Sequence, residues 1–382
     1  MLKIQGLILL FALNAWAASI SSEPSIRVRI AKAIHDVNIS GTDLVKTVSG
    51  QPIEQYYPGK KRFVFNCRPL KSLVKKNEPI LLAKITSRTG LMEFNQKKYR
   101  GSLFLVSSYK GKGCDVINKL NLETYISSLL PKEMNAKWPL EALKAQAVAA
   151  RSYAIHLIKT KQVKKTNGFE TYYDLENSEK HQVNGSFFEV TYETSKATRL
   201  TRGQVLLPKS QRITPIFFHS KCGGKTRLPE QVWSNKVDGY SSVDCPYCHK
   251  HGVADWKIDI PKSRFDHALR KGMQVYQNKD IKSQLSLAPD DKSYPQLRLY
   301  SNDDVHLLKK SRIRSILGRK KAPSNYFKFE KNNNNSITLN GKGYGHGVGL
   351  CQFGAYEMAK RGYSYTDILA HYFPEMKLKK LY

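Results

Sequence analysis

The chain is short of acidic side chains. Its 382 residues include 31 Asp and Glu against 63 Lys and Arg, which gives a formal net charge of +32 at neutral pH. A charge of this size favours an acidic partner. Nucleic acid is one candidate, but the sequence has no helix-turn-helix, RNP or zinc-finger spacing, so we expect no nucleic acid. A glycan that carries carboxylates fits better, and a proteome rich in lysine would account for much of the charge without any partner.

Long apolar segments are also scarce. Lys3 is followed by a mostly apolar run from Ile4 to Leu13 and then by Ala15-Trp16-Ala17, which is typical of a signal peptide with a cleavage site. We therefore predict a signal peptide over residues 1–17 and an exported mature chain, periplasmic or associated with the cell wall. An uncleaved anchor is the alternative, although the run is too short to span a bilayer easily. No later segment is long and apolar enough to do so, so no transmembrane segment is expected after signal cleavage.

Phosphate-binding glycine loops are absent. The glycines near the end of the chain alternate and leave no G-x-G-x-x-G or Walker spacing: Gly341, Gly343, Gly345, Gly347 and Gly349. Alternating glycine allows unusual backbone dihedrals and the close approach of a bulky ligand such as a sugar ring. Within this string His346 and Gln352 are the best-placed hydrogen-bonding side chains. A purely structural histidine is the alternative for His346.

Glu133 is predicted to lie on an apolar helix face, where a charged carboxylate is unfavourable. Apolar residues recur upstream of Glu133 at helical spacing, and Glu133 follows on the same face: Leu122, Tyr125, Ile126, Leu129 and Leu130. A carboxyl group held against apolar surface has a raised pKa and can carry a proton at neutral pH, as a general acid must. The alternative is that Glu133 ends a helix or pairs with a nearby lysine.

Two prolines flank this acid. Pro131 should break or kink the first helix just before Glu133, and Pro139 suits the first position of the next helix. Glu133 is therefore predicted at a bend between two helices, where a cleft can form. The second helix is rich in alanine and can pack closely against a neighbour, with Gln146 and Arg151 projecting from it.

Three ordered blocks make the chain recognisable. The first runs without a gap from Glu133 to Tyr153, the second is His219 to Thr226 with Trp233, and the third is Gly343 to Ala355. In these blocks the chain resembles the SpoIID family, which comprises stage II sporulation protein D and the related amidase-enhancer proteins. The similarity covers roughly residues 25 to 382.

This resemblance implies a peptidoglycan lytic transglycosylase. Such an enzyme cleaves the β-1,4 bond between N-acetylmuramic acid and N-acetylglucosamine and leaves a 1,6-anhydromuramyl end. Glu133 would act as general acid and then as general base, and no cofactor would be required for catalysis. Substrate would be bound by Arg151, Gln146, Tyr240, His346 and Gln352. The expected partners are peptidoglycan glycan strands, stripped of stem peptides or not, and a wall amidase. A non-catalytic wall-binding enhancer of an amidase is the alternative function.

The fold expected from these patterns is α+β and two-lobed. Residues 18–110 contain strand-prone runs and should form a β-rich N-terminal region, while helices dominate from Leu122 to Lys159. The catalytic region should span residues 111–382, with an inserted segment around 262–335 and a mixed β and α remainder. The helical pair and this remainder would form the substrate cleft.

Six cysteines leave three interpretations open. Cys245-Pro246-Tyr247-Cys248 forms a C-x-x-C knuckle, so a structural zinc ion could be held by Cys222, Cys245 and Cys248 together with His219 or His249. Disulfides would suit an exported protein. A glutaredoxin-like redox site is the third interpretation, although no helix is expected to open after Cys248.

The resemblance does not by itself support zinc at Cys222. Other members of the family can carry a zinc site of Cys and His in the loop that follows a Tyr-Asp-Leu motif. The corresponding loop here, from Tyr173 to Gln182, contains no cysteine. Cys351 stands where the family often has serine, a near-isosteric change, and no role as a nucleophile is expected for its thiol.

Overall fold

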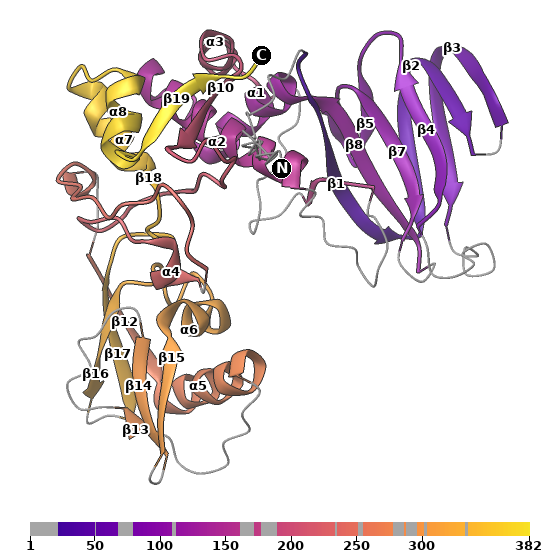
Figure 1. Cartoon of the computed structure of the whole chain (residues 1–382). Helices are drawn as coiled ribbons and strands as arrows, with labels where there is room; N and C mark the ends of the chain where they lie inside the picture. Colours follow the sequence, from indigo (N-terminus) through magenta and orange to yellow (C-terminus); the bar gives the residue numbers. More distant parts are fainter. Residues whose placement is uncertain are drawn as a thin grey trace, which may run out of the picture.

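The computed structural model has an α+β fold, which confirms the predicted class (Figure 1). It describes residues 22–49, 51–67, 79–108, 112–160, 172–176, 189–233, 235–250, 255–277, 286–287, 296–301, 304–332 and 335–382. The predicted signal peptide and most of the loop after the Tyr-Asp-Leu motif lie outside these ranges. Within them, no helix has both the length and the apolar character needed to cross a membrane.

The N-terminal part is one large curled sheet. Its strands are β1 (Ser25–Ile34), β2 (Asp36–Val48), β3 (Gln51–Asn66), β4 (Leu81–Ser87), β5 (Met92–Phe94), β6 (Lys97–Tyr99), β7 (Ser102–Ser107), β8 (Cys114–Asn121) and β9 (Leu175–Glu176). The strand order is β6-β5-β2-β4-β7-β8-β1-β9, and β3 pairs with β2. Alternate residues such as Val37, Ile39 and Ile85 face a core of their own. A disulfide between Cys67 and Cys114 joins the end of β3 to the start of β8.

A helical unit follows the sheet. It contains α1 (Leu122–Glu133), α2 (Leu140–Thr160), α3 (Tyr192–Leu200), α4 (Pro229–Val232), the 3-10 helix η5 (Cys248–Lys250), α7 (Gln352–Lys360) and α8 (Tyr365–Tyr372), with the strand pairs β10 (Gln204–Pro208) with β19 (Met376–Lys380) and β11 (Phe218–His219) with β18 (Leu350–Cys351). The alanine-rich α2 is buried along most of its length and packs against α1, α3, α7 and α8. Ile26 and Val28 of β1 belong to the same core, so the end of the sheet that contains β1 packs against the helices.

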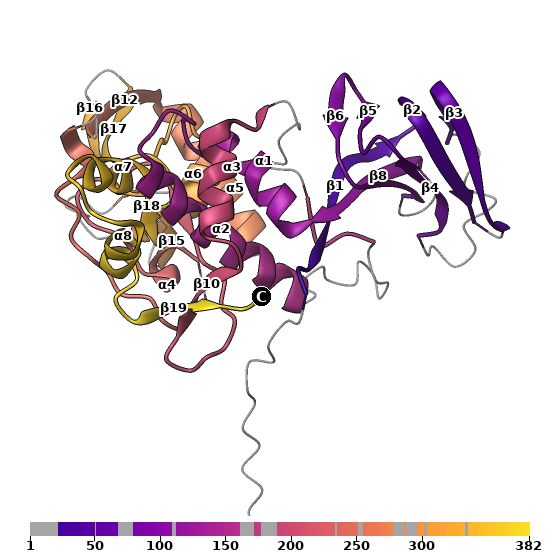
Figure 2. The same ribbon diagram turned by 90° about the horizontal axis from the view of Figure 1, so that it is seen from above.

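A third unit lies between η5 and the glycine-rich block. Its elements are β12 (Asp255–Pro261), α5 (Lys262–Gln277), β13 (Ser286–Leu287), β14 (Gln296–Ser301), β15 (Asp304–Lys309), α6 (Lys310–Leu317), β16 (Phe327–Asn332) and β17 (Ser336–Lys342). It has a separate core that includes Phe265, Leu299 and Leu339. Figure 1 shows it below the helical unit, and both views place the N-terminal sheet to the side of α1 (Figures 1 and 2). The predicted insertion around 262–335 falls inside this unit.

The bend around Glu133 differs in detail from the prediction. Helix α1 does not break at Pro131 but continues through it to Glu133. Pro131 sits in the last turn, where the missing amide hydrogen costs a single hydrogen bond, and the amide of Met134 still donates to the carbonyl of Leu130 at 2.9 Å. Helix α2 begins one residue after Pro139. Glu133 therefore ends α1 and opens the turn that leads to α2.

Candidate functional site

Glu133 lies near the buried Tyr125. Its side chain is partly exposed, whereas Leu129 and Leu130 on the preceding turn are fully buried. Burial raises the pKa of the Tyr125 hydroxyl well above its usual value, and the charges of Glu133 and Tyr153 add to this effect. Burial also raises the pKa of Tyr153, to about 12. Both hydroxyls are therefore protonated at neutral pH, and the Tyr125 hydroxyl is close enough to Glu133 for the charge of that carboxyl group to raise its pKa.

A set of half-buried aromatic rings continues from Tyr153, and we call it the aromatic wall: Tyr153, Phe217, Trp233 and His346. The ring centroids of Tyr153 and Phe217 are 6.0 Å apart, those of Phe217 and Trp233 are 4.6 Å apart, and those of Trp233 and His346 are 5.1 Å apart. Each of the three sequence blocks contributes to this wall. The fold thus brings the three blocks to one place, and Tyr125 lies near both Tyr153 of this wall and Glu133.

His346 is neutral in this environment. Its Nδ1 accepts a hydrogen bond from the amide of Val348 at 3.0 Å, so this nitrogen carries no proton. Burial and the neighbouring His219 hold the pKa of His346 well below its usual value. His219 is itself buried, and burial lowers its pKa to about 4. His346 is therefore a neutral imidazole at neutral pH, and its ring nitrogens are engaged with the backbone of Val348 and Phe218.

The alternating glycines have a structural cause that the sequence did not reveal. Gly343 and Gly349 adopt φ angles of +78° and +71°, where other residues are strained. A Cβ atom at Gly343 would lie 2.5 Å from the carbonyl oxygen of Lys221, and one at Gly349 would lie 2.2 Å from that of Phe217. The close approach that we expected from a sugar is made at these two positions by the chain's own backbone.

Trp138 of the first block packs against the third block and the helix that follows it. Its indole ring lies 4.9 Å from the rings of both Phe353 and Tyr356 on α7. Such edge-on and tilted contacts add to the energy of apolar burial. The turn after Glu133 is thereby fixed against the helix that follows the glycine-rich block.

Arg151 does not point into an accessible site. Its side chain is fully buried and forms a two-pronged ion pair with Glu123, at 2.8 Å from Nε and 2.7 Å from Nη2. Nη1 donates to the carbonyl of Gln204 at 3.1 Å. The guanidinium thus joins α2 to α1 and to β10. This geometry corrects the expectation of a substrate-binding arginine and favours a structural role.

Three other predicted ligands are also engaged or buried. The Tyr240 hydroxyl accepts from the amide of Phe217 at 2.8 Å and donates to the carbonyl of Pro215 at 2.9 Å. Gln352 is 7% exposed at the start of α7. Both polar atoms of the Gln146 amide are buried, without a hydrogen-bond partner in the part of the chain that the structure describes. Of the predicted substrate-binding residues, Tyr240 and His346 are half-buried, whereas Gln146, Arg151 and Gln352 are buried. The expectation missed the rings of Tyr153, which ends the first motif block, and of Phe217, which lies outside the three blocks.

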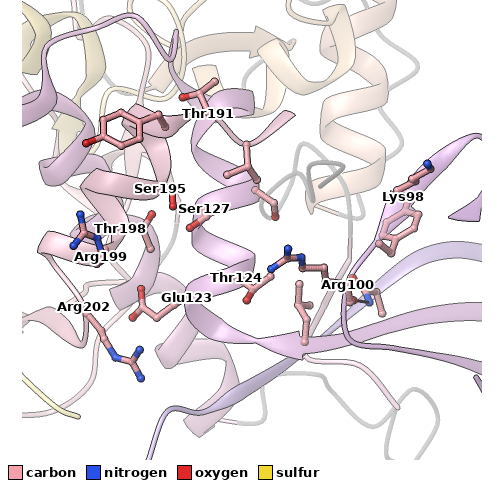
Figure 3. Close-up of a pocket in the computed structure, with 16 residues that line it drawn as sticks. Lys98, Arg100, Glu123, Thr124, Ser127, Thr191, Ser195, Thr198, Arg199 and Arg202 are labelled. Atoms are coloured by element: carbon pink, nitrogen blue, oxygen red, sulfur yellow. Dashed lines mark hydrogen bonds between the residues drawn. The ribbon is translucent and has the colours of Figure 1, made fainter. Parts of the chain in front are cut away.

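A basic pocket lies at the other end of α1, between that helix, α3 and the N-terminal sheet (Figure 3). Its cationic side chains are Lys98, Arg100, Arg199 and Arg202. Glu123 and Thr124 contribute to its wall, and Glu123 is held by Arg151. Because Glu133 follows Glu123 by ten residues at 1.5 Å per residue, the two acids are about 15 Å apart along the helix axis. The pocket is therefore a feature separate from the Glu133 site.

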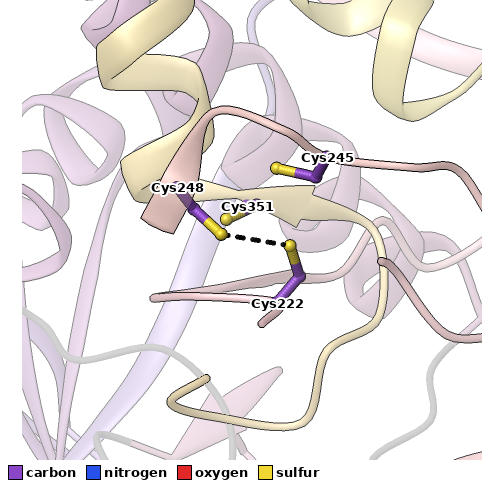
Figure 4. A group of neighbouring side chains, drawn as sticks. All are labelled: Cys222, Cys245, Cys248 and Cys351. Atoms are coloured by element: carbon purple, nitrogen blue, oxygen red, sulfur yellow. Dashed lines mark hydrogen bonds between the residues drawn. The ribbon is translucent and has the colours of Figure 1, made fainter. Parts of the chain in front are cut away.

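The cysteines divide into two groups. Cys67 and Cys114 form the disulfide of the N-terminal sheet. Four free and buried cysteines gather elsewhere, with their sulfur atoms all within 4.8 Å of one another: Cys222, Cys245, Cys248 and Cys351 (Figure 4). His219 and His249 are not members of this group. His219 Nδ1 instead donates to the carbonyl of Val348 at 3.0 Å, and His249 is exposed. Among the described residues, the fourth member of the group is Cys351, in place of the histidine that the sequence suggested.

Comparisons with known proteins identify the family of this chain. The family model described as Stage II sporulation protein matches residues 110–207. An uncharacterized protein of Brachyspira hyodysenteriae is 33% identical over 73% of this chain and 72% of its own length. Stage II sporulation protein D of Bacillus amyloliquefaciens is 28% identical over 67% and 74%, and the amidase enhancer of Bacillus subtilis is 28% identical over 65% and 39%. The chain belongs to the SpoIID family, as its three motif blocks predicted.

Proposed function

We propose that the protein acts on the bacterial cell wall as a peptidoglycan lytic transglycosylase, with Glu133 as the general acid and base. The observation that carries this proposal is the position of Glu133. Its carboxyl group is partly accessible at the end of α1, near the buried Tyr125, and Tyr125 in turn lies near Tyr153, where the aromatic wall begins. A family that includes sporulation and amidase-enhancing proteins supports the cell-wall context.

The reaction needs one carboxyl group. Protonated Glu133 donates its proton to the glycosidic oxygen, which leaves with the N-acetylglucosamine unit while an oxocarbenium-like centre develops at C1 of N-acetylmuramic acid. The C6 hydroxyl of the same sugar then attacks C1 and gives its proton to the Glu133 carboxylate. Glu133 is thereby returned to its starting state, and no water is consumed. Because the nucleophile belongs to the substrate, a second catalytic carboxylate is not required.

The residues around Glu133 fit this role. The protonated hydroxyl of Tyr125, whose pKa responds to the charge of Glu133, supplies a polar hydrogen that can stabilise the carboxylate formed after the first step. Trp233 and His346 present half-buried ring faces against which a pyranose can lie. A net charge of +32 attracts the lactyl and stem-peptide carboxylates of peptidoglycan. This substrate lies outside the cytoplasm, so the proposal requires the export that we expect from residues 1–17.

A second candidate function is a non-catalytic, wall-binding enhancer of an amidase. It is favoured by the similarity to the Bacillus subtilis amidase enhancer, of which the chain covers 39%. In that case the basic pocket of Arg100, Arg199 and Arg202 would hold wall carboxylates, and Glu133 would have no chemical role.

Mass spectrometry of digested glycan strands tests these candidates. The mature protein is incubated with purified strands that carry stem peptides and with strands stripped of them. A lytic transglycosylase releases fragments whose muramic acid ends are lighter by one water than hydrolytic ends and resist reduction by borohydride. Fragments with reducible ends would mean hydrolysis and would contradict the mechanism. Uncut strands, together with faster release of stem peptides by an added wall amidase, would establish the enhancer.

A further inference from the structure

The cluster of four buried cysteines is unrelated to the chemistry of Glu133. Cys222 follows β11, Cys245 and Cys248 flank the start of η5, and Cys351 ends β18. Their side chains point toward a common centre (Figure 4). The sulfur atoms of Cys222 and Cys248 are 3.5 Å apart, and all four lie within 4.8 Å of one another. Three segments far apart in the sequence thus deliver four thiols to one point.

We propose that these four cysteines hold a structural zinc ion. Four sulfurs at a Zn–S distance of 2.3 Å form a tetrahedron with edges of about 3.8 Å, which is close to the spacing seen here. A tetrahedral set of four sulfur ligands selects zinc or iron–sulfur chemistry, and a closed set of this kind is typical of structural zinc. Cys245 and Cys248 supply the usual two-residue knuckle.

The surroundings of the cluster are adapted to it. The Tyr372 hydroxyl lies 3.1 Å from the sulfur of Cys245 and can donate a hydrogen bond to a metal-bound thiolate. A Cβ atom at Gly354 would lie 2.9 Å from that sulfur and 1.9 Å from the Tyr372 hydroxyl, so only glycine fits there. Tyr372 is buried, which keeps water from the sulfurs.

Disulfides account less well for this arrangement. The described structure already pairs the two remaining cysteines, Cys67 with Cys114, in a different core. One bridge within the cluster would consume two sulfurs and would leave the other two as unpaired neighbours. Two bridges would require each sulfur to move to the 2.0 Å of an S–S bond with one partner and away from the others. A metal ion uses all four at the spacing that they have.

The zinc would position the aromatic wall, an inference that rests on the proposed function. Strands β11 and β18 pair over only two residues, Phe218 with Leu350 and His219 with Cys351. So short a pairing is weak by itself. The metal would tie the segment that carries Phe217 to the segment that carries His346. A four-ligand site leaves no position for substrate, so its effect on activity would be indirect.

Metal analysis of the mature protein tests the proposal without any activity assay. The protein, purified without chelators, should contain about one equivalent of zinc, the stoichiometry of a structural site. Replacement by Co²⁺ should give the visible spectrum of a tetrahedral tetrathiolate. Zinc below about a tenth of that stoichiometry, with a disulfide among the four in non-reducing peptide maps, would overturn the proposal. Iron with acid-labile sulfide would overturn it as well.

Variants decide which residue is the fourth ligand. Cys351→Ser should lower the zinc content and weaken the cobalt–thiolate absorption, whereas the matched control His249→Ala should retain both. The reverse result would overturn the assignment. If Cys351→Ser does not fold, Cys351→His keeps a zinc-binding group and should shift the cobalt spectrum toward that of a three-sulfur, one-nitrogen site; an unchanged spectrum would count against Cys351. Because the readout is metal binding, failure here leaves the Glu133 mechanism untouched.

Discussion

Replacing Arg151 with alanine should destabilise the fold, and it should do so without a specific effect on substrate affinity. The Arg151 side chain has no exposed surface and the Glu123 side chain is 13% exposed, so the pair is almost wholly desolvated. Removal of one partner leaves the other charge buried, which typically costs about 3 to 5 kcal/mol. Glu123 would keep the hydrogen bonds that it accepts from the amide of Gly203 and the hydroxyl of Tyr382. We therefore expect the free energy of unfolding to fall by about 3 kcal/mol, the lower end of this range.

Denaturant unfolding measures this loss, and the fluorescence of Trp138 and Trp233 reports on the helical unit. Arg151→Lys should recover only part of the stability, because an ammonium cannot form the two parallel bonds that Nε and Nη2 make to Glu123. A double-mutant cycle with Glu123→Gln should show a coupling energy of about 1 to 3 kcal/mol, as for other residues in direct contact.

The sequence alone suggested that Arg151 binds substrate, so the measurement discriminates between a substrate-binding and a structural arginine. If Arg151→Ala unfolds at the same denaturant concentration as the wild type while its KM for glycan rises, the arginine contacts substrate and the structural account is wrong. Normal kinetic constants in the folded fraction of a destabilised variant would agree with the structure.

Two further predictions concern stability. Breaking the disulfide with Cys67→Ser and Cys114→Ser should lower the free energy of unfolding of the N-terminal sheet by about 4 kcal/mol, which is the loop-closure value for a sequence separation of 47. A loss below about 1 kcal/mol in denaturant unfolding would contradict this prediction. The folded state keeps His346 neutral, so its lowered pKa contributes stability that is present above the ordinary pKa of 6.5 and is lost as the pH falls below that value. The stability difference between the wild type and His346→Gln should therefore shrink on acidification. A difference that is independent of pH would refute a lowered pKa for His346.

Several elements of the fold followed directly from the sequence. The apolar spacing from Leu122 to Leu130 predicted α1, and the alanine-rich run predicted the buried α2, because a period of 3.6 residues marks one face of a helix. The place of Pro131 was misjudged. In a last turn a proline removes one hydrogen bond without ending the helix, and propensity alone cannot tell a last turn from a break.

The site was harder to predict than the fold. Arg151 and Gln146 project from a helix that is buried on almost every side, and the sequence does not show which neighbours cover them. Cys351 was set aside because serine is nearly isosteric, yet the parallel pairing of β11 with β18 brings it to Cys222. Contacts between residues more than a hundred positions apart depend on topology, and local patterns do not encode it.

The rate at which Glu133→Gln releases anhydro-ended fragments tests the central claim most directly. The amide keeps the shape of the side chain but cannot cycle a proton, so we expect a loss of about 100-fold or more with nearly unchanged glycan binding and stability. The matched control is Glu189→Gln, whose carboxylate pairs with Lys132 next to Glu133 and which should retain activity. Full turnover by Glu133→Gln, or an equal loss in Glu189→Gln, would contradict catalysis by a single carboxyl group at Glu133.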